Sequence, residues 1–174
     1  VDERVLIMNR IEEKMAQLGV FGEIYTQVYK LDSCENWKQD YDEKLGSRRS
    51  RYMNYRSMAD HGVILSGATD LPMLIPDIPE AIYYGCGTYA ADGKEPVQPE
   101  NGLTIPEMLK TWTIGSQYAM EQEHILGTLE SGKQADIVVF DRNLFKTDIE
   151  EIRKAHVLRT ICAGQDVYKE MENR

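Results

Sequence analysis

The chain has 174 residues, 42% of them hydrophobic, and a formal net charge of −9 at pH 7. Its length predicts one domain, or pieces of two, and its composition allows a real hydrophobic core. The acidic balance argues against nucleic acid and against anionic membrane surfaces as partners. No apolar run approaches the roughly 18 residues that span a bilayer, and the charged, periodic first residues are unlike a signal peptide.

Three cysteines, Cys34, Cys86 and Cys162, lie far apart and lack Cys-x-x-Cys spacing. An odd count without such spacing predicts free thiols in a reducing compartment, so we expect a cytoplasmic location. The chain starts with valine instead of an initiator methionine, and we expect it to begin inside a longer protein.

The only basic cluster is the run Arg48-Arg49-Ser50-Arg51, with Arg56 nearby. Because the chain as a whole is acidic, we expect this cluster to be a solvated helix face or an intramolecular salt-bridge site.

The first predicted element is an amphipathic helix that ends at Gly19. Its apolar residues recur at steps of three and four, which places them on one helix face; they are Val5, Met8, Ile11, Met15 and Leu18. The β-rich stretch 20–31 follows and is expected to be a strand. A helix followed by a strand suggests an α/β unit.

Polar residues dominate 32–46, which we expect to be a loop. A second helix is expected over roughly 47–60, with Gly62 as its C-terminal stop. The next strand covers about 62–67, within the stretch HGVILSGATDLPM.

Residues 71–103 contain five of the six prolines and predict a long loop with a short helix near 79–84. Loops of this length in a compact domain are usually functional or disordered. Helical order returns afterwards, because Thr104 and Glu107 have the spacing of a capping box. Pro106 falls in the first turn, where proline is tolerated.

The last part of the chain changes character. The stretches GTLESGKQADIVVFD and VLRTICAGQDVYK are predicted to be short strands separated by glycine turns. Ala163-Gly164 falls where a hairpin would reverse. Residues 1–122 therefore predict an α/β part, and 125–174 a mostly β appendage.

A lone carboxylate, Asp70, follows the strand expected at about 62–67. In parallel α/β sheets and barrels, active sites form at the C-terminal ends of strands, where an acid binds a metal or takes a proton from water. The alternative is a turn aspartate before a proline, which accepts hydrogen bonds from backbone N–H groups. Turn aspartates are common, so the local sequence favours the second interpretation and leaves the first open.

The three histidines form no metal-binding or catalytic pattern. His61 precedes a glycine at a predicted helix C-terminus, where a histidine suits the helix dipole. His124 and His156 have no second histidine at His-x-His or His-x-x-x-His spacing, so we expect a structural or solvated role for both. No Ser-His-Asp order or phosphate loop stands out, and the tryptophans and tyrosines are expected to be packing residues.

Residues 113–143 resemble the C-terminal signature of the amidohydrolase superfamily. In that signature a helix reaches a small-residue stretch, and the pattern G-x-L-x-x-G-x-x-A-D-h-v-v-h-D follows, where h is apolar. The residues that fit this pattern are Gly127, Leu129, Gly132, Ala135, Asp136 and Asp141. The stretch VLRTICAGQDVYK resembles the hairpin that closes the family's small β-sandwich.

The resemblance extends upstream. Residues 37–73 are similar to the segment that ends in G-S-D-x-P in a branch that includes formamide deformylase-like amidohydrolases. Asp70-Leu71-Pro72 fits D-x-P. Ala68-Thr69 stands where Gly-Ser is usual, and Thr69 keeps the hydroxyl.

The resemblance implies an α/β fold in which residues 1–124 form the C-terminal part of a (β/α)₈ TIM-type barrel, its last two strands and their helices. Residues 125–174 would supply strands of the accompanying β-sandwich. It also implies a divalent metal, with zinc expected, at the strand C-termini. On this interpretation Asp70 ends strand eight, binds the metal and accepts a proton from the bound water, which then attacks the carbon of an amide-like small molecule.

A complete barrel takes about 250 residues, and the family's His-x-His pair is absent from this sequence. A catalytic zinc usually needs three protein ligands, so we expect a fragment of a hydrolase of carbon–nitrogen bonds that binds no metal and has no activity by itself. Two alternatives are a non-catalytic structural or oligomerisation module and one half of a split enzyme. Because a partial barrel exposes apolar edges, we expect self-association or association with the missing barrel half.

Overall fold

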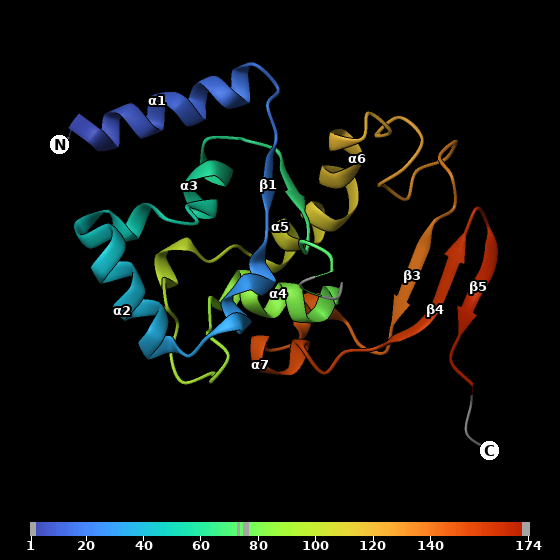
Figure 1. Ribbon diagram of the computed structural model, residues 1–174. Coiled ribbons are helices and arrows are strands. Elements are labelled where there is room, and N and C mark those ends of the chain that lie inside the picture. Colours follow the sequence, from blue (N-terminus) through green and yellow to red (C-terminus); the bar gives the residue numbers. More distant parts are fainter. Residues whose placement is uncertain (1–2, 73, 75–76, 172–174) are drawn as a thin grey trace.

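The computed structural model describes residues 3–72, 74 and 77–171, with side chains described from Met8 onward. It is a mixed α/β fold with two separate sheets, and the three-stranded one lies on the side of the molecule away from α1 and α2 (Figure 1). In chain order its elements are α1 (Glu3–Gln17), β1 (Gly22–Ile24), the 3₁₀ helix η1 (Thr26–Leu31), α2 (Cys34–Leu45), the 3₁₀ helix η2 (Gly46–Arg51), α3 (Tyr55–Asp60), β2 (Leu65–Gly67), α4 (Ile78–Gly87), the 3₁₀ helix η3 (Pro99–Asn101), α5 (Ile105–Lys110), the π-helix η4 (Thr111–Gly115), α6 (Ser116–Ala119), β3 (Ile137–Phe140), the 3₁₀ helix η5 (Leu144–Lys146), α7 (Ile149–Ile152), β4 (Val157–Cys162) and β5 (Gln165–Lys169).

Strands β1 and β2 pair in parallel, which confirms the expected α/β unit. Gly22 lies opposite Leu65 and Ile24 opposite Gly67. The N–H of Ala68 donates to the carbonyl of Ile24 (2.9 Å), which extends the pairing one residue past β2. The C-terminal ends of the two strands therefore lie side by side.

The core lies between this strand pair and helices α4 and α5. Ile24 and Leu65 of the strands share one buried cluster with Ala81, Ile82 and Met108 of the helices. None of these side chains is more than 8% exposed. Burial on this scale contributes about 25 cal/mol per Å² of apolar surface, so this cluster holds the strand ends in place.

The strand expected over 20–31 is shorter than predicted. It ends at Ile24, and Thr26–Leu31 forms the 3₁₀ helix η1 instead. The reason is tertiary, because the buried side chains of Thr26 and Gln27 both bond to α4. The Oγ1 of Thr26 donates to the carbonyl of Ala81 (2.9 Å), and the Nε2 of Gln27 donates to Glu80 (2.7 Å).

The prediction of a loop over 32–46 is wrong, because Cys34–Leu45 forms the helix α2. Ser33 caps it, with its Oγ accepting the N–H of Asn36 (3.2 Å). Cys34 and Tyr41 are buried on its inner face, and Trp37 packs against the same cluster. The polar composition concealed an apolar face at helical spacing.

The helix expected over 47–60 is divided into η2 and α3, although its stop at Gly62 (φ +79°) is confirmed. Two buried side-chain amides from a distant segment donate hydrogen bonds to backbone carbonyls. In a continuous helix these carbonyls would accept the N–H groups of the next turn. The Nε2 of Gln98 donates to the carbonyl of Arg49 (2.7 Å), and the Nδ2 of Asn101 donates to that of Tyr52 (3.1 Å).

The short helix expected near 79–84 exists and is longer, because α4 spans Ile78–Gly87 and is largely buried. Asp77 caps it by accepting the N–H of Glu80 (3.0 Å). The preceding Met73 and the pair 75–76 lie outside the described residues, so Pro76 of the expected proline-rich loop does too.

The capping box of Thr104 and Glu107 is confirmed at the start of α5. From there α5, η4 and α6 run on continuously and bring Gly115 against β2. A Cβ at Gly115 would lie 2.0 Å from the carbonyl oxygen of Leu65, and one at Gly67 would lie 2.7 Å from the indole of Trp112. Glycine is therefore required where this helix touches the strand.

The C-terminal strands form an antiparallel sheet in the order β3-β4-β5. The expected hairpin is confirmed, with Ala163 (φ +49°) and Gly164 (φ +78°) as the two turn residues. Two positive φ angles in succession define the turn type whose twist matches paired strands. Leu144 and Ile152 from this part of the chain are buried in the same cluster as Ala81.

The expectations for the basic cluster and the cysteines are also confirmed. Arg49 pairs with Asp42 (3.1 Å), and Arg56 pairs with Glu107 (2.7 Å) and with Asp60. All three cysteines are free thiols. Among the described residues, no helix is long and apolar enough to cross a membrane.

Replacing Gly115 with alanine tests the contact between helix and strand. In an ordinary helix position this change stabilises a protein by up to about 1 kcal/mol. Here the new methyl group would overlap the Leu65 carbonyl, so we expect the free energy of unfolding in urea to fall by roughly 1–3 kcal/mol. Gly22→Ala is the control, because its methyl group would meet the flexible end of Met58 and should cost less. A Gly115→Ala variant as stable as the wild type would contradict the contact.

Candidate functional site

The C-terminal ends of β1 and β2 bring three polar side chains to one edge of the sheet. Asp70 lies three residues beyond β2, in a turn, with an exposed side chain. Its φ is +57°, a left-handed conformation that aspartate adopts more readily than most residues. The structure thus places Asp70 beyond a parallel strand, as expected, and also within a turn.

The Asp70 carboxylate lacks a contact that five other aspartates make. Five aspartates accept a backbone N–H at 2.7–3.3 Å: Asp32, Asp77, Asp92, Asp136 and Asp141. Within the described part of the chain, the Asp70 carboxylate accepts no such bond and makes no ion pair. The Asp70 side chain is exposed, so its oxygens are accessible to solvent.

Tyr25 lies near both Glu23 and Asp70, and the sequence-based interpretation selected neither Tyr25 nor Glu23. Tyr25 directly follows β1, next to Ala68 at the end of β2. Burial raises the pKa of the Tyr25 hydroxyl above its ordinary 10.0, and the nearby carboxylates of Glu23 and Asp70 raise it further. In the sequence, the polar residues Glu23 and Tyr25 alternate with the apolar Ile24, which indicates that both lie on the same face of the strand. The sequence does not indicate that Tyr25 lies near Asp70, because that depends on how the two strands pair.

His61 lies at the N-terminal side of β2, away from Asp70, and ends α3 as expected. Its Nδ1 lies 2.8 Å from the carbonyl of Ser57 and 3.0 Å from the carboxylate of Glu12. Glu12 is only 2% exposed and also accepts bonds from Ser57 Oγ (2.5 Å) and Asn54 Nδ2 (3.1 Å). This cluster fastens α1 to α3.

The other two histidines are exposed, as expected. His124 lies 3.3 Å from Glu123. His156 lies between Asp141 and Glu170, 3.4 Å from each. Neither lies on the elements that carry Asp70.

Asp136 and Asp141 of the signature bracket β3 and tie it to β4. Asp136 accepts the N–H of Ala163 (2.7 Å) just after β4, and Asp141 accepts that of His156 (3.1 Å) just before β4. The Ala163 N–H lowers the pKa of Asp136. Arg142, with the His156 N–H, lowers the pKa of Asp141 to about 2. Both carboxylates are structural in this arrangement.

Comparison with known protein families decides the membership of the chain. A family model described as "Amidohydrolase family" matches residues 12–168, which span both sheets. The chain belongs to the amidohydrolase family.

Individual relatives agree with this assignment. The amidohydrolase chain is 28% identical over 173 residues to the N-substituted formamide deformylase of Arthrobacter pascens, covering 87% of this chain and 27% of that protein. It is 32% identical over 95 residues to the imidazolonepropionase of Brevibacillus brevis, covering 54% of this chain and 20% of that protein. The chain thus spans about a quarter of the length of these relatives.

Solved structures show the same fold. An amidohydrolase from Thermotoga maritima MSB8 matches with a TM-score of 0.59 at 18% identity, over 93% of this chain and 35% of that one. A second amidohydrolase matches with a TM-score of 0.57 at 15% identity, over 94% of this chain and 38% of that one. The two parallel strands of this amidohydrolase chain do not by themselves close a barrel.

The metal implied by the resemblance can be tested against the donor set. Among the described residues, no group of three or more histidine, cysteine, aspartate or glutamate side chains is placed to hold a metal ion. Zinc in catalytic sites takes three protein ligands and a water. The described residues of this amidohydrolase chain therefore do not form a complete zinc site around Asp70.

Lowering the pH tests the role of Asp141. Because the folded state holds the pKa of this carboxyl at about 2, below its ordinary 3.8, its stabilising effect is present above pH 4 and is lost as the pH falls towards 2. We expect the thermal midpoint of the wild type to fall more steeply between pH 5 and 2 than that of Asp141→Asn. Equal slopes in the two midpoint curves would show that Asp141 does not clamp the sheet.

Proposed function

We propose that this chain is part of a hydrolase that cleaves a carbon–nitrogen bond in an amide-like small molecule, with Asp70 as its catalytic carboxylate. The observation that carries the proposal is the position of Asp70 in a member of the amidohydrolase family. It lies beyond the C-terminal end of a parallel strand, where α/β folds place their chemistry. Its carboxylate makes no hydrogen bond within the described residues that would occupy it.

The proposed role of Asp70 is that of a general base. An exposed carboxylate takes a proton from the water that attacks the amide carbon, and the same group returns a proton to the departing nitrogen. A base at this position needs access to water and to substrate, which an aspartate engaged in capping a turn lacks. The backbone at Asp70 has a left-handed φ of +57°, and such unusual conformations often occur at functional sites.

The relatives suggest which amide-like compounds to try first. Both named relatives are hydrolases of carbon–nitrogen bonds. The match to the N-substituted formamide deformylase covers 87% of this chain, whereas the match to the imidazolonepropionase covers 54%. N-substituted formamides are therefore the first substrate class that we propose for this chain.

We further propose that the active enzyme includes more of the barrel than this chain supplies. In this proposal residues 1–124 are the C-terminal part of a TIM-type barrel and 125–174 are strands of the accompanying β-sandwich. A zinc site would then need ligands from the remaining barrel, because the described residues do not complete one. The isolated chain is expected to bind no zinc and to be inactive, and the free thiols agree with a cytoplasmic enzyme.

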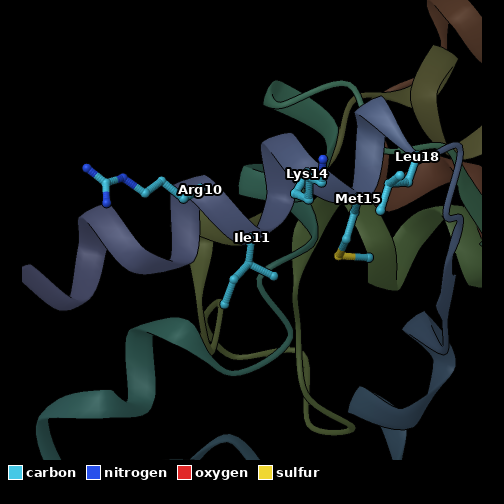
Figure 2. A pocket seen from close by; sticks show the side chains of 5 residues that line it. All are labelled: Arg10, Ile11, Lys14, Met15 and Leu18. Atoms are coloured by element: carbon cyan, nitrogen blue, oxygen red, sulfur yellow. The ribbon is translucent and has the colours of Figure 1, made fainter.

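The exposed face of α1 is the proposed site of association with the remaining barrel or with a second copy. An open surface cavity of about 510 Å³ lies along α1; it is lined by Arg10, Ile11, Lys14 and Met15 of the helix and by Leu18, the residue directly after it. Figure 2 shows that the five side chains come from α1 and the residue directly after it. Ile11 is 48% exposed and Leu18 65% exposed, which is unusual for an amphipathic helix whose apolar face is covered.

Replacing Asp70 with asparagine tests the catalytic role. Loss of a general base lowers turnover by roughly 10²–10⁴-fold, so we expect that reduction in the hydrolysis of an N-substituted formamide by the gene product that contains these residues. Asp148→Asn is the matched control, because Asp148 is exposed and lies at the start of α7. An Asp70→Asn enzyme with wild-type kcat would exclude the proposed role.

Size-exclusion chromatography tests the α1 surface. We expect the isolated chain, of mass 20.0 kDa, to elute as a larger species. Ile11→Glu should shift it towards the monomer, because a charge in an apolar interface opposes association. Gln17→Glu adds the same charge to the same helix outside the cavity and should not shift it. A wild-type chain that elutes as a monomer at every concentration tried would argue against this interface.

A further inference from the structure

Tyr25 faces the same side of the sheet as Glu23. Side chains alternate between the two faces of a strand, and Ile24, between them, is buried in the core at 1% exposure. Glu23 and Tyr25 therefore lie on the face that the helices α4 and α5 leave uncovered. The register that sets Ile24 opposite Gly67 brings this face to the turn that carries Asp70.

The residues on both sides of Tyr25 are buried, Ile24 at 1% and Thr26 at 2% exposure. Its N–H points to the hydroxyl of Tyr55 (3.5 Å), and the next residue, Thr26, is buried and bonded to the carbonyl of Ala81. Buried neighbours before and after it fix the direction of the tyrosine. A side chain held on a rigid element in this way suits a functional contact better than one on a mobile loop.

The charges around the Tyr25 hydroxyl make it a hydrogen-bond donor. Its neighbours Glu23 and Asp70 are carboxylates, which as ions only accept. A phenol beside two carboxylates stays protonated at neutral pH. Within this group of three side chains, only Tyr25 can donate a hydrogen bond to a substrate.

We propose that Tyr25 is a further substrate-contacting residue, whose hydroxyl donates a hydrogen bond to the carbonyl oxygen of the amide-like substrate. The inference rests on the proposed function and adds a second catalytic group to it. As water adds to the amide carbon, the carbonyl oxygen gains negative charge, and a preorganised donor stabilises that charge. Without substrate the hydroxyl lies near Glu23, and rotation about its single C–O bond turns its hydrogen to the substrate. In this proposal Asp70 accepts the proton of the attacking water, and Tyr25 stabilises the negative charge that develops on the carbonyl oxygen.

Tyr25→Phe in the gene product that contains these residues tests this role. Removing one such donor lowers kcat by roughly 10²–10³-fold, and we expect that reduction with a smaller change in KM. Replacing the carbonyl oxygen of the substrate with sulfur weakens the bond that Tyr25 donates. The ratio of amide to thioamide turnover should therefore fall towards unity in Tyr25→Phe. Tyr168→Phe, in the exposed strand β5, is the control and should keep the wild-type ratio.

The outcomes separate this inference from the proposed function. If Asp70→Asn abolishes turnover but Tyr25→Phe keeps the wild-type kcat and thioamide ratio, the role of Tyr25 is wrong and that of Asp70 stands. If neither variant loses activity, the proposed function fails too. The isolated chain gives a second measurement, because the ¹³Cζ resonance of Tyr25 should move in Asp70→Asn and not in Asp148→Asn. An unmoved resonance would overturn the proximity on which the inference depends.

Discussion

The contact between Gly115 and the Leu65 carbonyl is the constraint on which the candidate site depends. Helix η4 can approach the backbone of β2 this closely only because position 115 has no side chain. That approach presses α5 and η4 onto a strand of three residues, which is too short to be stable alone. The strand in turn sets the direction in which the chain leaves towards Asp70. A glycine in a small-residue stretch of the family signature thus supports the site from the opposite side of the strand.

The same constraint explains why the site has two contributors. Because β2 is held by the helix, β1 aligns on it through the bonds of Gly22 and Ile24. The register then fixes Tyr25 beside the segment that leads to Asp70. Parallel strands end at the same edge of a sheet, so a residue that follows one strand meets a residue that follows its neighbour. Neither side chain could be placed by considering its own strand alone.

The features that the sequence predicted correctly are local. The capping box of Thr104 and Glu107 and the Ala163-Gly164 turn depend on residues within a few positions of each other. The features that it missed depend on distant partners. The helix over 47–60 breaks because Gln98 and Asn101, each 49 positions further along the chain, donate hydrogen bonds to its carbonyls. Helix α2 was missed because its apolar face is aromatic: Trp37 packs on Tyr29 and Tyr41 packs on Tyr52. These rings belong to a cluster that also contains Tyr83 and Tyr84, which the polar sequence of α2 does not indicate.

The residues that identify the family are not the residues proposed for its chemistry. Asp136 and Asp141, which make the signature easy to recognise, hold β3 against both ends of β4 and are occupied by backbone N–H groups. Asp70, which fits a weaker part of the resemblance, accepts no such bond within the described residues. A structural carboxylate is fixed by the partners it satisfies, and here these are backbone N–H groups that the fold places. A catalytic carboxylate must keep its oxygens available to the substrate, so it makes few hydrogen bonds to neighbouring residues. Few residues around it are therefore needed to support it, and the sequence pattern that marks it is short. The sequence signature that identifies this family therefore indicates the sheet β3-β4-β5. The candidate site can be located only when the register of the parallel strands β1 and β2 is known.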